Sequence, residues 1–360
     1  MSHLIPPVTS PAAWKGPEID WKKEGLHIFD SAELQEIDGA LKHLKSLGNL
    51  DIPQITRETF PLDKVGKFIE SLREKLLYGR GFAMLRGLPR DSYSADDMAR
   101  IYFGLGCYLG DNMTQSYLGD YLGHVIDVSD VEPKSRAYRK GGAQSMHTDS
   151  CDVIGLMCMR TAKQGGESRL ASSMAIYNEM LRTRPDLAEV LCKGFIHRRS
   201  EEDGKHATRY TSPEPIPLFT MVEGQPSCYF LGGYVKRAEE MGDIKLTKLD
   251  HEAIDEFERL ARSPDFYLDM SFADGDIQFI NNRITVHGRT DYEDYREMAK
   301  RRHLMRIWLS IPTWPKRPAQ VFHQPEDHRL WSLNRRPYME FPSIALKELE
   351  DRYQALAAAE

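Results

Sequence analysis

Short apolar segments divided by turn residues dominate the chain from about residue 140 onward. The segments that we expect to form strands are 153–159, 228–231, 277–280 and 304–311. Strands of this length, separated by Gly, Asp and Asn, are typical of a β sandwich or barrel. Helical patterns at 174–183 and 185–193 interrupt the series, and the polar stretch at 200–217 resembles a surface excursion or mobile lid. We therefore expect a β-rich core that carries an insertion.

The first 110 residues predict a layer of helices with one strand. The expected helices are 31–47, 62–78 and 95–109, and the strand lies in GFAMLRGLP at 81–89. Asp30 and Glu33 form a capping-box pattern before the first helix, and Ser94 is a suitable N-cap for the third. This front part should pack onto the β-rich core.

The composition is that of a compact protein without a strong charge bias. Of the 360 residues 41% are hydrophobic, and 48 Lys and Arg against 54 Asp and Glu give a net charge of −6. This balance predicts no general attraction to nucleic acid or to anionic membranes. The five cysteines form no CxxC pair, which favours reduced thiols over a disulfide framework or a structural zinc site. The chain start shows no secretory pattern, so we expect a cytoplasmic protein.

His147-Thr148-Asp149 is the sharpest local feature that could carry chemistry. Alternate side chains of an extended strand share a face, so His147 and Asp149 can reach one ion while Thr148 points away. Taken alone, the tripeptide is weak evidence, because solvated or capping pairs give the same pattern.

His287, in VHGR at 286–289, can supply a second imidazole. Two histidines and one carboxylate on one side of an ion form the facial triad of non-haem Fe(II) oxygenases. Because His287 follows His147 by 140 residues, only a long-range fold can bring the two together, as the two sheets of a jelly roll would.

The predicted strand at 302–311 has two unlike faces. The residues of one face are Arg302, Leu304, Arg306, Trp308 and Ser310. The other face is mostly apolar and should pack on neighbouring elements, which leaves the two arginines to line a cavity. Guanidinium groups suit carboxylates there. The alternative is a solvated basic run over 300–306.

Four ordered motifs resemble the iron(II)/2-oxoglutarate dioxygenases of the taurine dioxygenase (TauD/TfdA) family. The motifs are HTD at 147–149, GGESRLASS at 165–173, VHGR at 286–289 and RxLxR at 302–306. The resemblance covers roughly residues 80–312 and includes TQSYLGDYLGHV at 114–125, where this family places part of its substrate pocket. It implies Fe(II), 2-oxoglutarate and O2 as the cofactor and co-substrates. It also implies that His147, Asp149 and His287 are the catalytic metal ligands.

The resemblance further implies that Arg302 pairs with the distal carboxylate of 2-oxoglutarate. Ser168, where many relatives have Thr, would donate to the same carboxylate. Arg306 would contact either the other end of 2-oxoglutarate or an anionic substrate. The spacing of 15 residues between His287 and Arg302 is wider than in taurine-type members, so Arg301 is the fallback for the anchoring role, although strand parity places it on the face opposite Arg302.

The implied reaction oxidises a C–H bond of a small molecule and releases succinate and CO2. Hydroxylation, desaturation and cyclisation all stay open. The candidate substrate-binding residues are Gln115, Tyr117, Phe230 and Arg306. An amino acid, another small carboxylate or a natural-product intermediate would fit this site, and self-association stays open. Asp149 argues against a halogenating relative, in which the carboxylate ligand is replaced.

The expected architecture is a single domain over 1–360, mainly β with α, built on a double-stranded β-helix (jelly-roll, cupin-like) core. Its parts are an α+β N-terminal layer at 1–110, the core at 140–312 with an insertion at about 174–260, and a C-terminal extension at 313–360. The alternatives are a non-catalytic jelly-roll binding protein and a metal-dependent hydrolase that uses the same triad. The first should lack a ligand or the arginine, and the second gives Arg302 and Ser168 no role.

Overall fold

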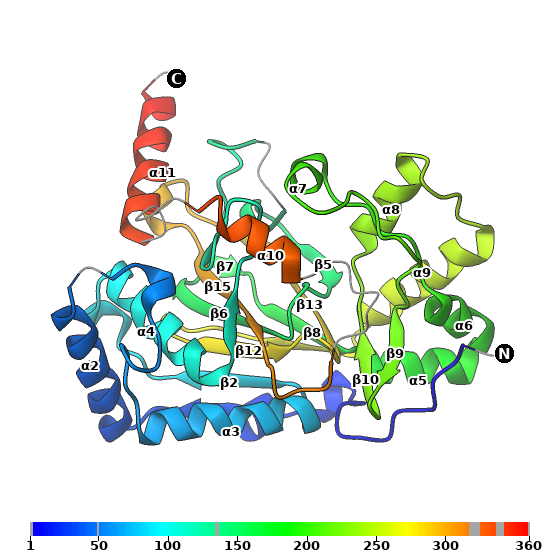
Figure 1. The fold of residues 1–360 in the computed structure, drawn as a ribbon, viewed down its shortest axis with the longest axis horizontal. Coiled ribbons are helices and arrows are strands. Elements are labelled where there is room, and N and C mark those ends of the chain that lie inside the picture. The colour runs from blue at the N-terminus through cyan, green and yellow to red at the C-terminus, as the bar shows by residue number, and fades with distance from the viewer. Residues whose placement is uncertain (1–2, 49, 134–136, 317–324, 336–341, 359–360) are drawn as a thin grey trace.

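Two main sheets organise the protein, whose structure is a computed structural model that describes residues 3–48, 50–133, 137–316, 325–335 and 342–358 (Figure 1). The larger sheet has seven strands in the order β1-β2-β12-β6-β15-β3, and β4 also pairs with β15. The bounds of its strands are β1 Leu26–Ile28, β2 Phe82–Arg86, β3 Asp111–Met113, β4 Gly123–Ile126, β6 Val153–Arg160, β12 Ile277–Asn281 and β15 His303–Ser310.

The smaller sheet has the order β11-β8-β13-β5, and two two-stranded ribbons, β10-β9 and β14-β7, lie beside the sheets. The bounds are β5 Gln144–His147, β7 Gln164–Gly165, β8 Ser168–Ser172, β9 Phe219–Val222, β10 Gln225–Cys228, β11 Tyr267–Met270, β13 Thr285–Arg289 and β14 Tyr292–Glu293. β13 pairs antiparallel with both β8 and β5, and its His287 is the register partner of His147 in β5. The smaller sheet therefore joins segments 140 residues apart.

Three of the four expected strands are present with nearly the expected bounds, as β6, β12 and β15. The prediction of a strand at 228–231 was wrong beyond Cys228, where β10 ends. There the backbone of Phe230 bonds to Thr148 instead of a neighbouring strand, and Leu231 already caps the next helix. β1, close to the N-terminus, was not predicted.

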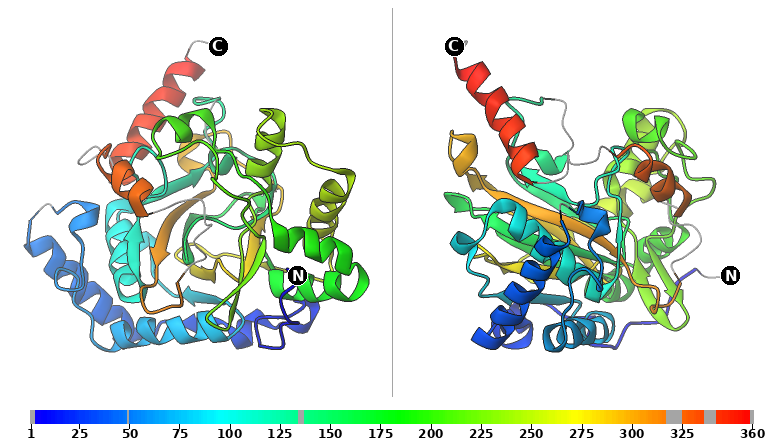
Figure 2. Two further views of the ribbon diagram at one scale, coloured as in Figure 1. Left: turned by 45° about the vertical axis from the view of Figure 1, so that its right-hand side comes forward. Right: turned by 60° about the vertical axis from the view of Figure 1, so that its left-hand side comes forward.

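A helical layer covers the outer face of the larger sheet, as the front part of the sequence predicted (Figures 1 and 2). Its helices are α2 Ser31–Ser46, α3 Lys64–Tyr78 and α4 Ala95–Leu109. The capping box of Asp30 and Glu33 is present, and the Ser94 side chain accepts a hydrogen bond from the backbone of the third helix. The apolar face of β15 packs into this layer through Met305, Ile307 and other core residues.

A second group of helices lies at the opposite end of the molecule, beside the smaller sheet (Figure 1). These helices are α5 Ser173–Thr183, α6 Pro185–Lys193, α7 Glu201–Lys205, α8 Gly232–Glu240 and α9 Lys248–Ala261. Because all of them fall between β8 and β11, they occupy the region that the sequence predicted as an insertion.

Two helices follow the last strand. α11, Pro342–Ala357, matches the closing helix that was expected near 342–358. α10, Pro325–Ser332, was not predicted, because its contacts come from distant parts of the chain: Asp327 pairs with Arg199, and Trp331 donates to the backbone of His206. The rest of the irregular stretch expected there lies partly outside the described residues.

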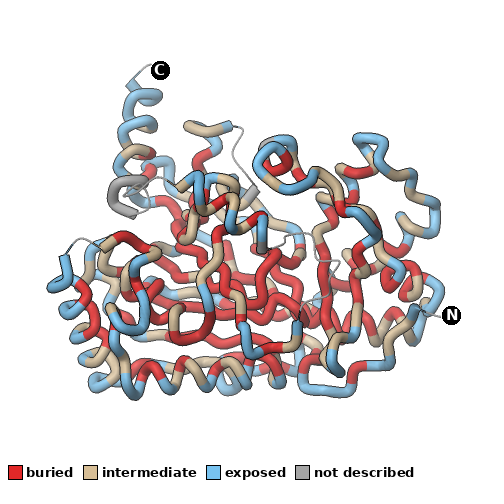
Figure 3. Tube along the Cα trace, viewed as in Figure 1, coloured by how far each residue is buried: buried red, intermediate tan, exposed pale blue. Residues whose placement is uncertain are grey.

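Short elements complete the chain. They are α1 Trp21–Glu24 and the 3-10 turns Gly16–Glu18, Ile52–Gln54, Arg90–Ser92, Ala137–Arg139 and Met298–Lys300. Burial is concentrated along the central strands (Figure 3). All five cysteines are free thiols, and among the described helices none has the length and apolar character needed to cross a bilayer.

Candidate active site

The smaller sheet brings His147, Asp149 and His287 together. His147 ends β5 opposite His287 in β13, and their ring centroids lie 4.5 Å apart. Nε2 of each histidine lies 3.9 Å from a carboxylate oxygen of Asp149, His147 from Oδ1 and His287 from Oδ2. One ligand atom of each residue lies within 4.8 Å of the others, a spacing that suits one shared ion.

The backbone around Asp149 is held from outside its own strand. β5 ends at His147, so Asp149 lies in the following loop and not in the extended strand that the tripeptide suggested. Asn282 fixes this loop, since its Oδ1 accepts from the Asp149 amide at 3.0 Å and its Nδ2 donates to the Asp149 carbonyl. Thr148 points away from the site and bonds to the backbone of Phe230.

Hydrogen bonding at His147 and burial at His287 leave both imidazoles suited to a metal. His147 Nδ1 lies 2.8 Å from the carbonyl oxygen of Ser145, which fixes the proton on Nδ1 and leaves the Nε2 lone pair for an ion. Burial, aided by the nearby His147, lowers the pKa of His287 to about 3, so that its imidazole is neutral at pH 7. The His287 Nδ1 is buried and has no hydrogen-bond partner in the described part of the chain.

Asp149 is a buried carboxylate that stays ionised. Burial raises its pKa, but the charge of Arg306 and a hydrogen bond from Trp308, with the two imidazoles, keep that pKa below the ordinary value. Trp308 Nε1 donates to Oδ2 at 3.0 Å, and Arg306 Nη1 donates to the same oxygen at 3.3 Å. Two imidazoles and one carboxylate are the donor set of a facial iron(II) site, and these residues fit that group.

Arg302 and Ser168 line a cavity that adjoins His147 and His287. Arg302 is only 4% exposed, and its Nη2 donates to the carbonyl of Gly166 at 3.0 Å. Burial and the nearby charge of Arg289 lower its pKa to about 10, so the guanidinium remains charged at pH 7. Among the described residues no carboxylate forms an ion pair with Arg302. A buried arginine in this state favours an anionic ligand.

The neighbouring arginines have different surroundings. Arg301 pairs with Asp130, at 2.9 Å between Nη1 and Oδ1, and does not line the cavity, as strand parity predicted. Arg306 does line it, but its Nε donates to Gln115 Oε1 at 2.7 Å, and Tyr138 packs against its guanidinium. Gln115 also donates to the backbone carbonyl of Arg306. Gln115 therefore fixes the position of Arg306 through hydrogen bonds to both its side chain and its backbone.

Two of the expected substrate residues lie in packing positions. The Tyr117 ring stacks on His206, with centroids 4.9 Å apart. Phe230 is buried in the core against Phe257, with centroids 4.6 Å apart. Neither these two side chains nor Gln115 lines the two cavities that adjoin the triad.

A second, larger cavity of about 260 Å³, open to solvent, adjoins the triad. Its walls come from β5, β15, α7 and α8, and Trp308 lines it from the strand face that the sequence predicted. The lining residues that the sequence did not suggest are Tyr138, Gln144, Ser150, Ser200, Asp203, Leu231, Tyr234 and Arg237. Ser200 and Asp203 belong to the stretch expected to be a lid. Nothing in their local sequence shows that the insertion folds back over the metal site.

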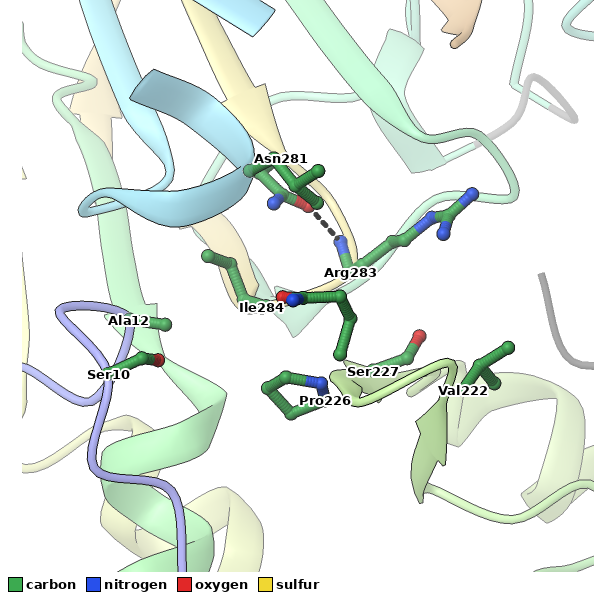
Figure 4. A pocket seen from close by; sticks show the side chains of 10 residues that line it. Ser10, Ala12, Val222, Pro226, Ser227, Asn281, Arg283 and Ile284 are labelled. Carbon is green, nitrogen blue, oxygen red and sulfur yellow. Dashed lines mark hydrogen bonds between the residues drawn. The ribbon is translucent and has the colours of Figure 1, made fainter. Parts of the chain in front are cut away.

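A further cavity lies away from the triad, between the N-terminal segment, β10 and the turn after β12 (Figure 4). The Arg283 amide donates to Asn281 Oδ1 at 2.9 Å there, which closes the turn. Arg283 also pairs with Asp152 at 2.8 Å. These contacts give the turn before β13 its shape.

Comparison with known proteins places this site in a family. Residues 45–308 match the family described as "Taurine catabolism dioxygenase TauD, TfdA family". The chain is 28% identical over 325 residues to FR-33289 synthase of Streptomyces rubellomurinus (strain ATCC 31215), covering 88% of this chain and 94% of that protein. It is also 28% identical over 353 residues to a taurine hydroxylase-like protein of Stachybotrys chartarum (strain CBS 109288 / IBT 7711), covering 91% and 88%.

Solved structures share the fold. Asparagine oxygenase in complex with Fe(II), 2S,3S-3-hydroxyasparagine and succinate superposes with a TM-score of 0.60 at 15% identity, over 79% of this chain and 93% of that one. The non-heme iron oxygenase OrfP in complex with Fe and alpha-ketoglutaric acid gives 0.57 at 16% identity, over 79% and 94%. The chain belongs to the TauD/TfdA family and is a dioxygenase that depends on iron(II) and 2-oxoglutarate.

Proposed function

We propose that the protein oxidises a C–H bond of a small molecule at an iron(II) ion held by His147, Asp149 and His287. The observation that carries this proposal is the convergence of these three donors beside a buried, charged Arg302 without a carboxylate partner in the described chain. When bound, iron(II) and 2-oxoglutarate activate O2, and 2-oxoglutarate becomes succinate and CO2. The two cavities give the co-substrate and the substrate separate places.

The residues of the first cavity suit the distal carboxylate of 2-oxoglutarate. Arg302 offers a guanidinium fork, and Ser168 lines the same space with its hydroxyl. The Ser168 hydroxyl donates to Gln278 Oε1 at 2.7 Å, so it would turn away from Gln278 to donate to the carboxylate of the co-substrate. Arg306 is held by Gln115 and Asp149, which favours a role in orienting the metal carboxylate and the near end of 2-oxoglutarate.

The two alternative functions, a hydrolase and a non-catalytic binding protein, do not account for Arg302 and the three metal donors. A hydrolase with the same triad gives no reason to bury the charged Arg302, because desolvation of an unpaired guanidinium is costly. A jelly-roll binding protein without catalysis does not need three donors at one point.

The substrate classes stay an amino acid, another small carboxylate or a natural-product intermediate, oxidised by hydroxylation, desaturation or cyclisation. Neighbours crystallised with (3S)-hydroxy-L-Arg and hydroxyasparagine support a polar small molecule.

The architecture proposed for this function is one domain over 1–360 with a double-stranded β-helix core. Its support is the antiparallel pairing of strands distant in sequence, β6 with β12 and β15, and β13 with β8 and β5. The N-terminal layer, the insertion and the C-terminal extension would then be additions to that core. We also propose a cytoplasmic location, where reduced thiols and ferrous iron persist.

The test begins with the spectrum of the bound metal. Anaerobic addition of Fe(II) and 2-oxoglutarate to the full chain should give the weak visible charge-transfer band of the chelate, and Asp149→Ala should abolish it. Absence of the band in the unmodified chain, with iron binding unchanged in Asp149→Ala, would refute the proposal.

Titration of the same band tests the co-substrate anchor. Arg302→Gln should raise the dissociation constant of 2-oxoglutarate about 30-fold or more, since one partner of a buried charge pair is lost. Arg301→Gln, whose side chain faces Asp130, is the control and should change that constant by less than about twofold. A larger increase of the dissociation constant in Arg301→Gln than in Arg302→Gln would assign the binding of the distal carboxylate to Arg301.

A further inference from the structure

The larger cavity beside the triad contains an arginine that none of the family motifs includes. Arg237 belongs to α8 and lines this cavity together with His147, Asp149 and Trp308. A ligand in the cavity can therefore contact both the metal centre and α8.

The direction of Arg237 follows from helical spacing. Leu231, Tyr234 and Arg237 are three residues apart at and within α8, so their side chains share one face of the helix, and all three line the cavity. Val235 and Ala238 form the face of α8 that is buried in the protein. Burial of the Val235 and Ala238 face thus leaves the face that carries Arg237 directed toward the cavity.

Arg237 differs from the other cations near it. Its guanidinium has no hydrogen bond or ion pair with any residue in the part of the chain that the structure describes. Arg306, the other arginine of the cavity, is held by Gln115 and Asp149. Lys236, the next residue along α8, is exposed and lies 3.6 Å from Glu258.

Two acidic side chains near the end of α8, Glu239 and Asp243, are engaged elsewhere. Glu239 accepts from the amide of Leu246 and lies 3.2 Å from His251 Nε2. Asp243, beyond the end of the helix, pairs with Arg198 at 2.8 Å. Arg237 is therefore the cation of this wall that remains available to a ligand.

We propose that Arg237 binds an oxyanion of the primary substrate and so sets the substrate specificity of this dioxygenase. This inference rests on the proposed function, because it takes the larger cavity as the substrate site. A guanidinium fork binds carboxylate, phosphonate and sulfonate groups by the same paired hydrogen bonds. The substrate would hold its anionic group against α8 and present a C–H bond toward the triad, and Asp203 in the same cavity would disfavour a second anion there.

Three methyl-bearing probes test this site: acetate, methylphosphonate and methanesulfonate. Their binding to the full chain is measured by saturation-transfer NMR under anaerobic conditions, with Fe(II) and saturating 2-oxoglutarate present, so that Arg302 is occupied. At least one probe should bind, and Arg237→Gln should weaken it about tenfold or more. Arg237→Lys should restore part of the affinity, because the charge is kept.

Lys236→Gln is the matched control, since it removes the same charge from the same helix outside the cavity. It should change probe affinity by less than about twofold, and its melting temperature should match that of Arg237→Gln. The identity of the tightest probe distinguishes a carboxylate from a phosphonate or sulfonate substrate. The proposal is overturned if no probe binds the unmodified chain or if Arg237→Gln binds as tightly.

The charge-transfer band separates this inference from the proposed function. Arg237→Gln should retain the band of Fe(II) and 2-oxoglutarate at full intensity, because it lies outside the triad and the Arg302 cavity. Loss of probe binding with an intact band supports Arg237 as the anion site. An intact band with unchanged probe binding overturns only the Arg237 inference, whereas absence of the band in the unmodified chain overturns the proposed function.

Discussion

The carboxylate of Asp149 is positioned by neighbours as much as by its own backbone. Trp308 and Arg306 both donate to Oδ2, while Oδ1 lies toward His147. Such contacts fix which oxygen and which lone pair a metal meets, and their loss commonly costs ten- to a hundredfold in metal affinity. Trp308 is therefore a positioning residue, although it would touch no metal itself.

Trp308→Phe should weaken metal binding about tenfold, because the ring is kept while the donor to Asp149 is lost. Titration with Mn(II), followed by electron paramagnetic resonance, measures the dissociation constant. Trp314→Phe is the control, since Trp314 is also buried but its Nε1 has no partner in the described structure. Equal constants in the two variants would contradict the positioning role.

A histidine pair between β4 and β15 should make folding sensitive to acid. His124 Nδ1 lies 3.0 Å from His303 Nε2, and burial, with the charge of Arg139, lowers the pKa of His124 from 6.5 to about 4. As the pH falls below 6.5 the unfolded chain binds the proton first, so stability is complete above that pH and declines toward pH 4.

Between pH 7 and pH 5 the free energy of unfolding should fall, and His124→Gln should reduce that fall by about 2 kcal/mol. Urea denaturation at the two pH values measures the difference. His251→Gln, at an exposed histidine, should leave the fall unchanged. If the free energy of unfolding falls as much in His124→Gln as in the unmodified chain, this histidine does not titrate as its burial predicts.

The sequence predicted the placement of side chains where the backbone pattern fixes their direction. Strand parity placed Arg302 toward the cavity and Arg301 away from it, and the structure agrees. Strand parity could not predict the hydrogen bond between Gln115 and Arg306 or the packing of Phe230 on Phe257. Both contacts join segments that are distant in the sequence. Arg237 had no local signal at all.

At the scale of elements, α10 contacts the part of the insertion that lines the larger cavity. Asp327 and Arg199 form a fully buried ion pair at 2.7 Å, and Asp327 also accepts from Thr208. Between these two anchors lies α7, whose Asp203 lines the cavity. The C-terminal region thus holds one wall of the proposed substrate site.

Asp327→Asn should loosen α7, because removal of one partner leaves a buried charge at a cost of about 3–5 kcal/mol. Hydrogen exchange over residues 200–211 should speed up, while the band of Fe(II) and 2-oxoglutarate persists. Glu326→Gln is the control, since the neighbouring Glu326 pairs with Arg329 on the exposed side of α10. Unchanged exchange in Asp327→Asn would mean that α10 does not hold the wall.

Prediction of elements succeeded where a segment carries its own pattern. α2 has its capping box and apolar repeat, and β15 alternates between an apolar face and a cavity face. The strand at 228–231 failed because the backbone of Phe230 pairs with the loop at Thr148. α10 was missed because eight residues with little apolar surface become helical through the buried partners of Asp327 and Trp331.

At the scale of the whole molecule, the larger sheet joins the N-terminal layer to the later strands. β2 of the N-terminal layer pairs with β12, and α4 packs on β15. The sequence predicted a single domain over 1–360 from the distance between His147 and His287, since both must reach one point, and that division of the chain stays a prediction. It could not predict how the insertion and α10 are placed, because their contacts depend on the finished fold.

The full chain should unfold in one calorimetric transition. Mn(II) and 2-oxoglutarate together should raise its midpoint, because ligands that bind only the folded state add about 2.7 kcal/mol at a hundred times their dissociation constant. Asp149→Ala should lose the metal-dependent part of that increase. Two separate transitions would contradict a single cooperative unit.

The register pairing of His147 with His287 also dictates when iron can enter during synthesis. A chain still on the ribosome that has not released β13 presents one imidazole and one carboxylate, too few donors for the proposed site. Pairings between such distant strands form late, because their loop-closure entropy must be overcome first. Metal capture would therefore report the pairing of β5 with β13, and a chain made only as far as β12 would be unable to consume 2-oxoglutarate and oxygen unproductively.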